Sequence, residues 1–162
     1  MIFILDAYNV IHKIKSLEAA LDRNLRAGRD ALVLFCSEVI ERRGNISKII
    51  LVFDGKTQFH DMTNVVANKI EAVFSDTGED ADDRIITVLE ELENTFNKCV
   101  VSDDNFVRNS ARAHRAKGMS VAEFEEFCRM KNTPVKNTPS GKSVLDAETA
   151  DAITEEYKKK LG

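Results

Sequence analysis

The chain has 162 residues, of which 43% are hydrophobic and 31% are charged, and its net charge is −4. This length suits one domain with a single core, and no apolar run reaches the ~20 residues that a membrane-spanning helix needs. The opening stretch MIFIL is too short for a signal peptide and has no basic region before it, so we expect a cytoplasmic protein with no membrane partner. The acidic balance neither indicates nor excludes a nucleic-acid partner, because bound cations can reverse the local charge.

Short apolar runs rich in β-branched residues recur along the chain and predict strands. They cover residues 2–5, 48–53, 69–74 and 98–102, with a short fifth run at 119–121. The stretches between them predict helices over residues 26–44, 80–96 and 104–117, and Ser120 with Glu123 fits a capping box that opens another helix through about Met130. Strands separated by helices predict an α/β fold, a three-layer α/β/α sandwich around a mostly parallel sheet.

The last thirty residues differ from the rest in composition. Residues 131–145 hold both prolines of the chain and read as a loop or mobile linker, and residues 146–161 read as a terminal helix that is charged on most sides. We therefore expect one domain over residues 1–130, followed by a polar linker and C-terminal helix over 131–162.

The cysteines and histidines do not suggest a zinc site. Cys36, Cys99 and Cys128 lack Cys-x-x-Cys spacing and lie in apolar stretches, which indicates reduced, buried side chains. The three histidines are scattered along the sequence, without the clustering that zinc ligands show.

Acidic residues follow the predicted strands. Asp6 ends the first strand and leads into an expected turn, Asp54 ends the second, and Asp103 with Asp104 ends the fourth. The third strand is followed by GEDADDRI, which puts Asp80, Asp82 and Asp83 at the start of a helix. The carboxyl ends of parallel strands share one edge of the sheet, so these carboxylates are expected to converge there.

Each acid has an ordinary local explanation as a helix cap or a turn residue, and for any one of them that explanation is at least as good as a functional one. Caps and turns do not explain why carboxylates from four segments should gather at one edge, where like charges repel. A hard divalent cation relieves that repulsion, and carboxylates without a Cys or His cluster favour Mg²⁺ or Mn²⁺. Asn9 would supply a neutral ligand or orient a water.

Four ordered motifs resemble the NYN group of PIN-like ribonucleases, and within it the YacP-like branch. They are LDAYNVI, VFDG, EDADDRI and VVSDDN, and the resemblance covers about residues 1–130. It implies a PIN-like fold and a metal-dependent endoribonuclease that hydrolyses RNA phosphodiester bonds with Mg²⁺ or Mn²⁺. Carried over by position, Asp6, Asp82 and Asp103 match the metal-binding and catalytic acids, and Asn9 matches the catalytic amide. Asp54 and Asp83 match further acids of the metal site, whereas Asp80 stands where relatives often have Thr.

Basic residues near this edge are candidates for binding RNA phosphates. Arg108 and Arg112 lie one turn apart on a predicted helix, and His12, Lys13 and Lys56 follow motif acids. An ordinary solvated surface explains each of them as well. Tyr8 could stack on a base, although packing within the turn explains it better.

Other functions fit the motifs less well. A phosphatase with an Asp nucleophile needs Asp-x-Asp after the first strand, where this chain has Tyr8, and a receiver domain needs paired acids there. The main alternative is a non-catalytic module that binds RNA or the ribosome. The retained acids argue against it, because binding RNA without a metal favours their loss.

Overall fold

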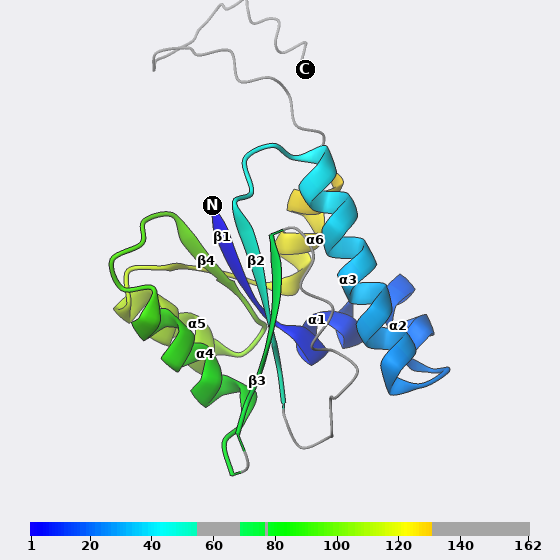
Figure 1. Cartoon of the computed structure of the whole chain (residues 1–162), viewed down its shortest axis with the longest axis horizontal. Helices are drawn as coiled ribbons and strands as arrows, with labels where there is room; N and C mark the ends of the chain where they lie inside the picture. Colours follow the sequence, from blue (N-terminus) through cyan, green and yellow to red (C-terminus); the bar gives the residue numbers. More distant parts are fainter. Residues whose placement is uncertain (55–68, 77, 131–162) are drawn as a thin grey trace, which may run out of the picture. The chain divides into compact units, whose positions relative to one another are not determined.

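The computed structural model describes residues 1–54, 69–76 and 78–130 (Figure 1). The strands are β1 (Ile2–Asp6), β2 (Lys48–Phe53), β3 (Ile70–Phe74), β4 (Lys98–Val101) and β5 (Lys117–Met119). The helices are α1 (Ala7–Lys13), α2 (Lys15–Leu21), α3 (Leu25–Arg42), α4 (Ala81–Glu91), α5 (Asn105–Ala113) and α6 (Val121–Arg129).

The strands form one five-stranded sheet in the order β3-β2-β1-β4-β5, and every neighbouring pair is parallel. This confirms the predicted α/β sandwich. The chain moves outward from β1 to β2 and β3, then returns to place β4 on the other side of β1. The strand order therefore switches between β1 and β4, and open α/β sheets bind ligands at the carboxyl ends of the strands beside such a switch.

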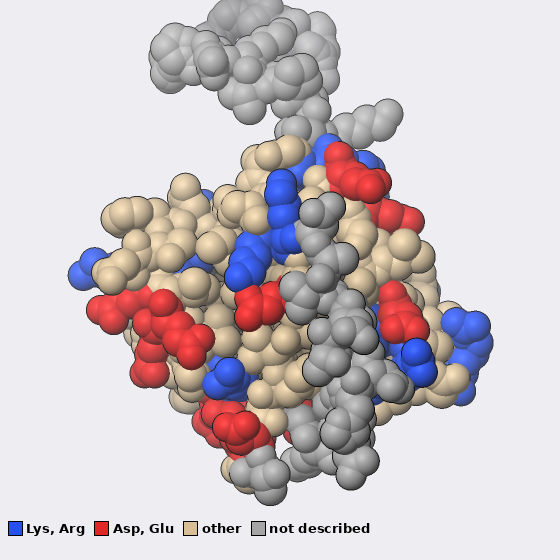
Figure 2. Space-filling model, viewed as in Figure 1, with Lys and Arg blue, Asp and Glu red and all other residues tan. Residues whose placement is uncertain are grey.

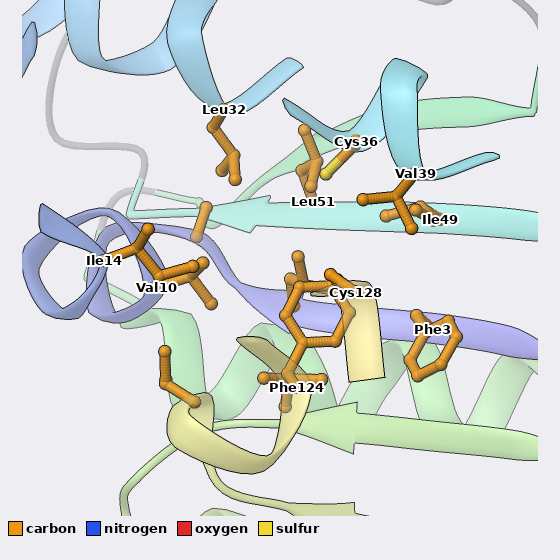
Figure 3. Close-up of a cluster of buried hydrophobic side chains, with 14 of the residues drawn as sticks. Phe3, Val10, Ile14, Leu32, Cys36, Val39, Ile49, Leu51, Phe124 and Cys128 are labelled. Atoms are coloured by element: carbon orange, nitrogen blue, oxygen red, sulfur yellow. The ribbon is translucent and has the colours of Figure 1, made fainter. Parts of the chain in front are cut away.

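The two faces of the sheet have separate hydrophobic clusters, because successive strand residues point to opposite sides. Phe3 and Leu5 of β1 lie in the cluster that α1, α2, α3 and α6 cover (Figure 3). There Phe3 packs edge-on against Phe124 of α6, with ring centroids 5.4 Å apart. Ile4 lies in the other cluster, beneath α4 and α5. Helices thus cover both faces of the central strand.

The start of α1 differs from the sequence prediction. A turn was expected after Asp6, but α1 begins at the very next residue. Ala7, Val10 and Ile11 are buried, which is the i, i+3, i+4 spacing of a helix that packs one face on a core. The tertiary contacts of this face explain how so short a helix forms.

The later elements match the predictions with adjusted ends. The capping box is present, because Glu123 N donates to Ser120 Oγ and Ser120 N donates to Glu123 Oε1. Since Ser120 caps α6, the short fifth strand ends at Met119 instead of running to residue 121. Helix α4 ends at Glu91 and α5 at Ala113, both a few residues earlier than expected.

A buried lysine explains the early end of α4. Lys98 is only 2% exposed, and its ammonium donates to the carbonyls of Leu92 (2.9 Å), Thr95 (3.0 Å) and Glu93 (3.5 Å). These carbonyls follow the last turn of α4 and have no helical partner of their own. Lys98, the first residue of β4, therefore links this strand to the end of α4.

The remaining expectations concern the cysteines and the end of the chain. All three cysteines are free and buried, as predicted. The predicted linker over 131–145 and the predicted terminal helix over 146–161 lie outside the described residues. Among the helices that the structure describes, none has the length and apolarity to cross a membrane.

Candidate active site

Asp6 lies at the carboxyl end of β1, beside the switch in strand order. Its Oδ2 accepts a hydrogen bond of 3.1 Å from Ser102 Oγ, just beyond the end of the neighbouring β4. Burial raises the pKa of Asp6 to about 6, and the charges of Asp82 and Asp104 add to the rise. The hydrogen bond from Ser102 acts in the opposite direction and lowers the pKa. At neutral pH the carboxylate is still mainly ionised, with a strong tendency to take up a cation or a proton.

Asp82 lies in the first turn of α4, and its charge acts on Asp6. Burial raises its pKa, and the charges of Asp104, Asp80 and Asp83 raise it further. Asp80 is the N-cap of α4, because its Oδ1 accepts from Asp83 N at 2.9 Å. Helix capping therefore explains Asp80, whereas the Asp82 side chain does not cap the helix.

Asp104 is the third acid of this group, and the sequence analysis did not place it among the metal ligands. Its backbone N–H donates to Ser102 Oγ (3.1 Å), and its Oδ1 accepts from Phe106 N (2.8 Å) as the N-cap of α5. Its charge raises the pKa of both Asp6 and Asp82. We call Asp6, Asp82 and Asp104 the acid cluster.

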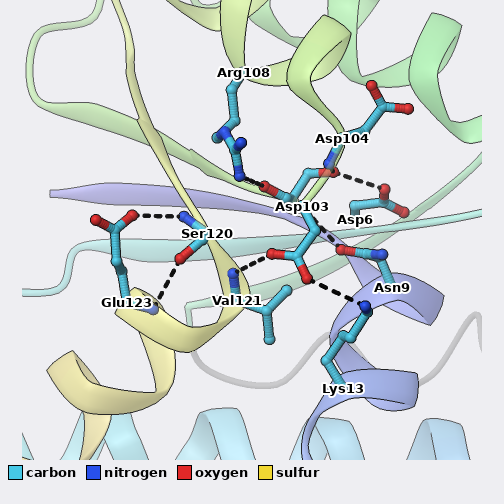
Figure 4. A network of polar contacts seen from close by, with 10 residues as sticks. Asp6, Asn9, Lys13, Asp103, Asp104, Arg108, Ser120, Val121 and Glu123 are labelled. Carbon is cyan, nitrogen blue, oxygen red and sulfur yellow. Dashed lines mark hydrogen bonds and ion pairs between the residues drawn. The ribbon is translucent and has the colours of Figure 1, made fainter.

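Asp103, which was predicted to hold metal, points elsewhere (Figure 4). Its Oδ1 accepts from Val121 N at the start of α6 (2.9 Å), and its Oδ2 pairs with Lys13 Nζ (3.6 Å). Its own backbone N–H donates to Asn9 Oδ1 (2.9 Å). In this conformation the side chains of Asp103 and Asn9 join α1, the end of β4 and α6, whereas a backbone hydrogen bond from Asn9 acts on Asp6 and lowers its pKa.

Asp54 follows β2, the strand on the other side of β1. Its Oδ1 is buried and has no hydrogen-bond partner among the described residues. A buried carboxylate oxygen without a partner is costly, so it marks a position that a further donor or a cation would stabilise. Asp83, the other predicted metal ligand, is exposed and makes its contact to Asp80 through its backbone.

The basic residues that were predicted to bind RNA phosphates differ in the contacts that they make within the protein. Lys13 pairs with Asp103, and Arg108 donates to the Ser102 carbonyl (3.0 Å) and to Asn105 Oδ1. Arg112 is exposed and donates to Asn109 Oδ1 (2.8 Å), and His12 is exposed at the end of α1. Lys56 lies outside the described residues.

Tyr8 is partly buried and packs against the hydrophobic core. Its ring meets Phe53 edge-on, with centroids 5.3 Å apart. This contact joins the first turn of α1 to the end of β2, which favours the packing role for Tyr8.

The chemistry of the acid cluster fits a hard divalent cation. The cluster offers only carboxylate oxygens, and burial together with the neighbouring acidic charges raises the pKa values of Asp6 and Asp82. Across the described ranges, however, no three Asp, Glu, His or Cys side chains stand close enough together to hold a metal ion. A cation would therefore have to draw the carboxylates of the cluster toward one another.

Acidic side chains also gather over α4 on the face seen in Figure 2. This helix carries Asp82 and Asp83 in its first turn and Glu90 and Glu91 in its last. The negative charge at the end of α4 that faces the acid cluster would repel a phosphate backbone unless cations bind there.

Comparison with known proteins identifies the family. The family model described as the YacP-like NYN domain matches residues 3–162, and the chain belongs to this family, as the motifs indicated. The match extends through residues 131–162, beyond the part that the motifs cover. No curated protein matches the chain.

Two solved structures share the fold. The crystal structure of Rae1 (YacP) from Bacillus subtilis superimposes with a TM-score of 0.65 at 24% identity, over 79% of this chain and 73% of that one. The W164L mutant of the same protein gives 0.63 at 24% identity, over 78% and 74%.

Proposed function

We propose that this member of the YacP-like NYN family, a family of PIN-like nucleases, is a metal-dependent endoribonuclease. The observation that carries the proposal is the acid cluster. Three carboxylates from three separate segments lie near the carboxyl ends of β1 and β4, beside the switch in strand order, and the charge of Asp104 contributes to the raised pKa values of both Asp6 and Asp82. Such a set is unfavourable without a cation and serves no evident structural purpose in the case of Asp6 and Asp82.

The proposal assigns Asp6, Asp82 and Asp104 to hold Mg²⁺ or Mn²⁺, with Asp54 close by as a further acid. When bound, the cation activates water and offsets the charge that develops on the phosphodiester. Ser102 fixes the Asp6 carboxylate through its hydroxyl and the Asp104 backbone through the same oxygen. Asp103 and Asn9 are positioning residues in this scheme, since they hold the end of β4 against α1 and α6.

The substrate is RNA on the strength of the family, and the exposed Arg112 with Arg108 on α5 offers positive charge for its phosphates. Attack by water, not by the ribose 2′-hydroxyl, leaves a 5′-phosphate and a 3′-hydroxyl. A cytoplasmic location and an association with the ribosome belong to the same proposal.

The alternative is a non-catalytic module that binds RNA or the ribosome. It is favoured by one observation, namely that no three metal-binding side chains of the described residues stand together. Under this alternative the acids would be dispensable for every activity of the protein.

One experiment separates the two functions. Labelled single-stranded and structured RNAs are incubated with the protein in Mg²⁺, in Mn²⁺ or in EDTA, and the fragments are resolved on a gel. Cleavage by the wild type that stops in EDTA and in Asp6→Asn supports the nuclease. Glu90→Gln, which changes an exposed acid in the last turn of the same helix that carries Asp82, is the matched control and should cleave normally. Cleavage that persists in EDTA, or equal cleavage by Asp6→Asn, contradicts the proposal.

A further inference from the structure

An aromatic side chain is exposed next to the acid cluster. Phe106 lies in the first turn of α5 and is 60% exposed. The helix packs on the sheet through Val107 and Ala111, which are fully or almost fully buried, so Phe106 contributes little to the core. Exposing a phenyl ring is unfavourable in water, which calls for a reason at this position.

The backbone of Phe106 is tied directly to the cluster. Its N–H donates to Asp104 Oδ1 at 2.8 Å, so the backbone of Phe106 is in direct contact with one carboxylate of the acid cluster. Since α5 begins at Asn105, the position of the ring is set by the same helix end that positions Asp104. An RNA strand whose phosphate lies at the acid cluster would have its neighbouring bases within reach of this ring.

The basic side chains nearest to the acid cluster also make contacts within the protein. The Lys13 ammonium pairs with Asp103, and the Arg108 guanidinium donates to Ser102 O and Asn105 Oδ1. The carboxylates of the acid cluster themselves repel a phosphate backbone when no cation is bound, so the electrostatic contribution to binding is weak at this point. Stacking of a base on an aromatic ring involves no net charge, so it provides affinity where the electrostatic contribution is weak.

We propose that Phe106 is a stacking surface for an unpaired nucleobase, and that it makes the protein select single-stranded RNA next to the scissile phosphate. This rests on the proposed function, since it is the acid cluster that defines where the strand lies. Bases within a duplex have both faces covered by their neighbours, whereas an unpaired base can leave its strand and stack on a side chain. A flexible single strand is accordingly the substrate class, and the contact tolerates any of the four bases because each has a π-face.

The chain offers a matched control for this ring. Phe96 is 86% exposed, but it precedes Lys98 at the amino end of β4, whereas Phe106 follows the carboxyl end of the same strand. Phe96→Ala removes an even more exposed ring from the opposite edge of the sheet. Neither ring is part of a buried cluster, so thermal melting should confirm that both variants fold like the wild type.

Binding is measured in EDTA, where the proposed nuclease does not cleave, so that binding and cleavage are tested separately. The probes are a fluorescein-labelled single-stranded RNA and the corresponding duplex, and a single strand that carries 2-aminopurine reports stacking through quenching of its fluorescence. Phe106→Ala should weaken single-strand binding about 5- to 150-fold, as expected for one stacked base, and should abolish the quenching. Phe106→Trp should retain both, and Phe96→Ala should match the wild type.

Three results would overturn the proposal: wild-type protein that does not bind the single strand, Phe106→Ala that binds it equally well, or Phe106→Leu that binds and quenches like the wild type. The last result would show that any apolar side chain suffices at this position, which is what contact with a protein partner would require. Failure of the proposed function has a different signature, because the wild type would then cleave no RNA in Mg²⁺ or Mn²⁺ whatever the result for Phe106.

Discussion

Ser102 Oγ donates a hydrogen bond to Asp6 Oδ2 at 3.1 Å, across the ends of two adjacent parallel strands. Ser102 is fully buried, and the same oxygen accepts from the backbone N–H of Asp104 at 3.1 Å. One hydroxyl thus fixes two members of the acid cluster relative to each other. This explains how the cluster keeps a defined arrangement although its charges repel.

Ser102→Ala should impair activity at low pH more than at high pH. The lost hydrogen bond lowers the pKa of Asp6 in the wild type, so the variant should have a higher Asp6 pKa and need a higher pH to ionise it. The unpaired Asp104 N–H should cost about 1–2 kcal/mol of stability. A pH–rate profile and a denaturant melt measure the two effects, with Ser110→Ala on α5 as the control. An unchanged profile would show that the hydroxyl does not act on Asp6.

Asp6→Asn should stabilise the metal-free protein near neutral pH. Since the folded-state pKa of Asp6 is raised to about 6, the carboxyl group favours folding when protonated, and this contribution is lost as the pH rises from about 4 to about 6. The variant has no such loss, so it should exceed the wild type by up to about 3 kcal/mol at pH 7, at 1.36 kcal/mol per pKa unit. Urea melts in EDTA at pH 4 and pH 7 test this. A gain that is equal at both pH values would contradict it.

Asp103 and Asp104 should respond differently to a divalent cation. MnCl₂ should raise the melting temperature of the wild type and of Asp103→Asn, because Asp103 faces Lys13 and Val121. It should not raise that of Asp104→Asn, in which Asn still caps α5 as well as Asp does. Thermal shift assays with and without EDTA make the comparison. The reverse pattern would move the metal site to Asp103.

Lys98→Met should destabilise the protein strongly without affecting the acid cluster directly. Methionine fills a similar volume but leaves the carbonyls of Leu92 and Thr95 without the donor that they have in the wild type. The expected loss is about 2–4 kcal/mol, since two partly buried acceptors lose a charged partner. Chemical denaturation measures it, and a loss below about 1 kcal/mol would mean that water replaces the ammonium.

Removing residues 132–162 should leave a folded domain. The two hydrophobic clusters are built from residues between Met1 and Cys128, and the end of α6 is held by Arg43, which donates to the carbonyls of Phe127 and Met130. A chain that ends at Lys131 retains all of these contacts and should melt cooperatively. A broad or absent transition would show that the domain needs the remainder of the chain.

The sequence predicted the sheet and most helices, because strands such as KIILVF are apolar throughout and the spacing in α4 is clear. It did not predict α1, since seven residues are too few to show a period and the helix depends on burying Val10 and Ile11. It also could not distinguish Asp103 from Asp104. These acids are adjacent, and which one faces Asp6 depends on the turn after β4, which is set by Asn9 and Val121 from distant parts of the chain.

The position of β1 between β2 and β4 has a consequence for synthesis. A ribosome releases β1 first and β2 some forty residues later, but the other edge of β1 stays unpaired until β4 emerges after residue 101. Asp6 meets Ser102 and Asp104 only then, so a nascent or prematurely terminated chain lacks an assembled acid cluster. Under the proposed function, the growing chain would therefore be unable to bind its cation and cut RNA until its domain is nearly complete.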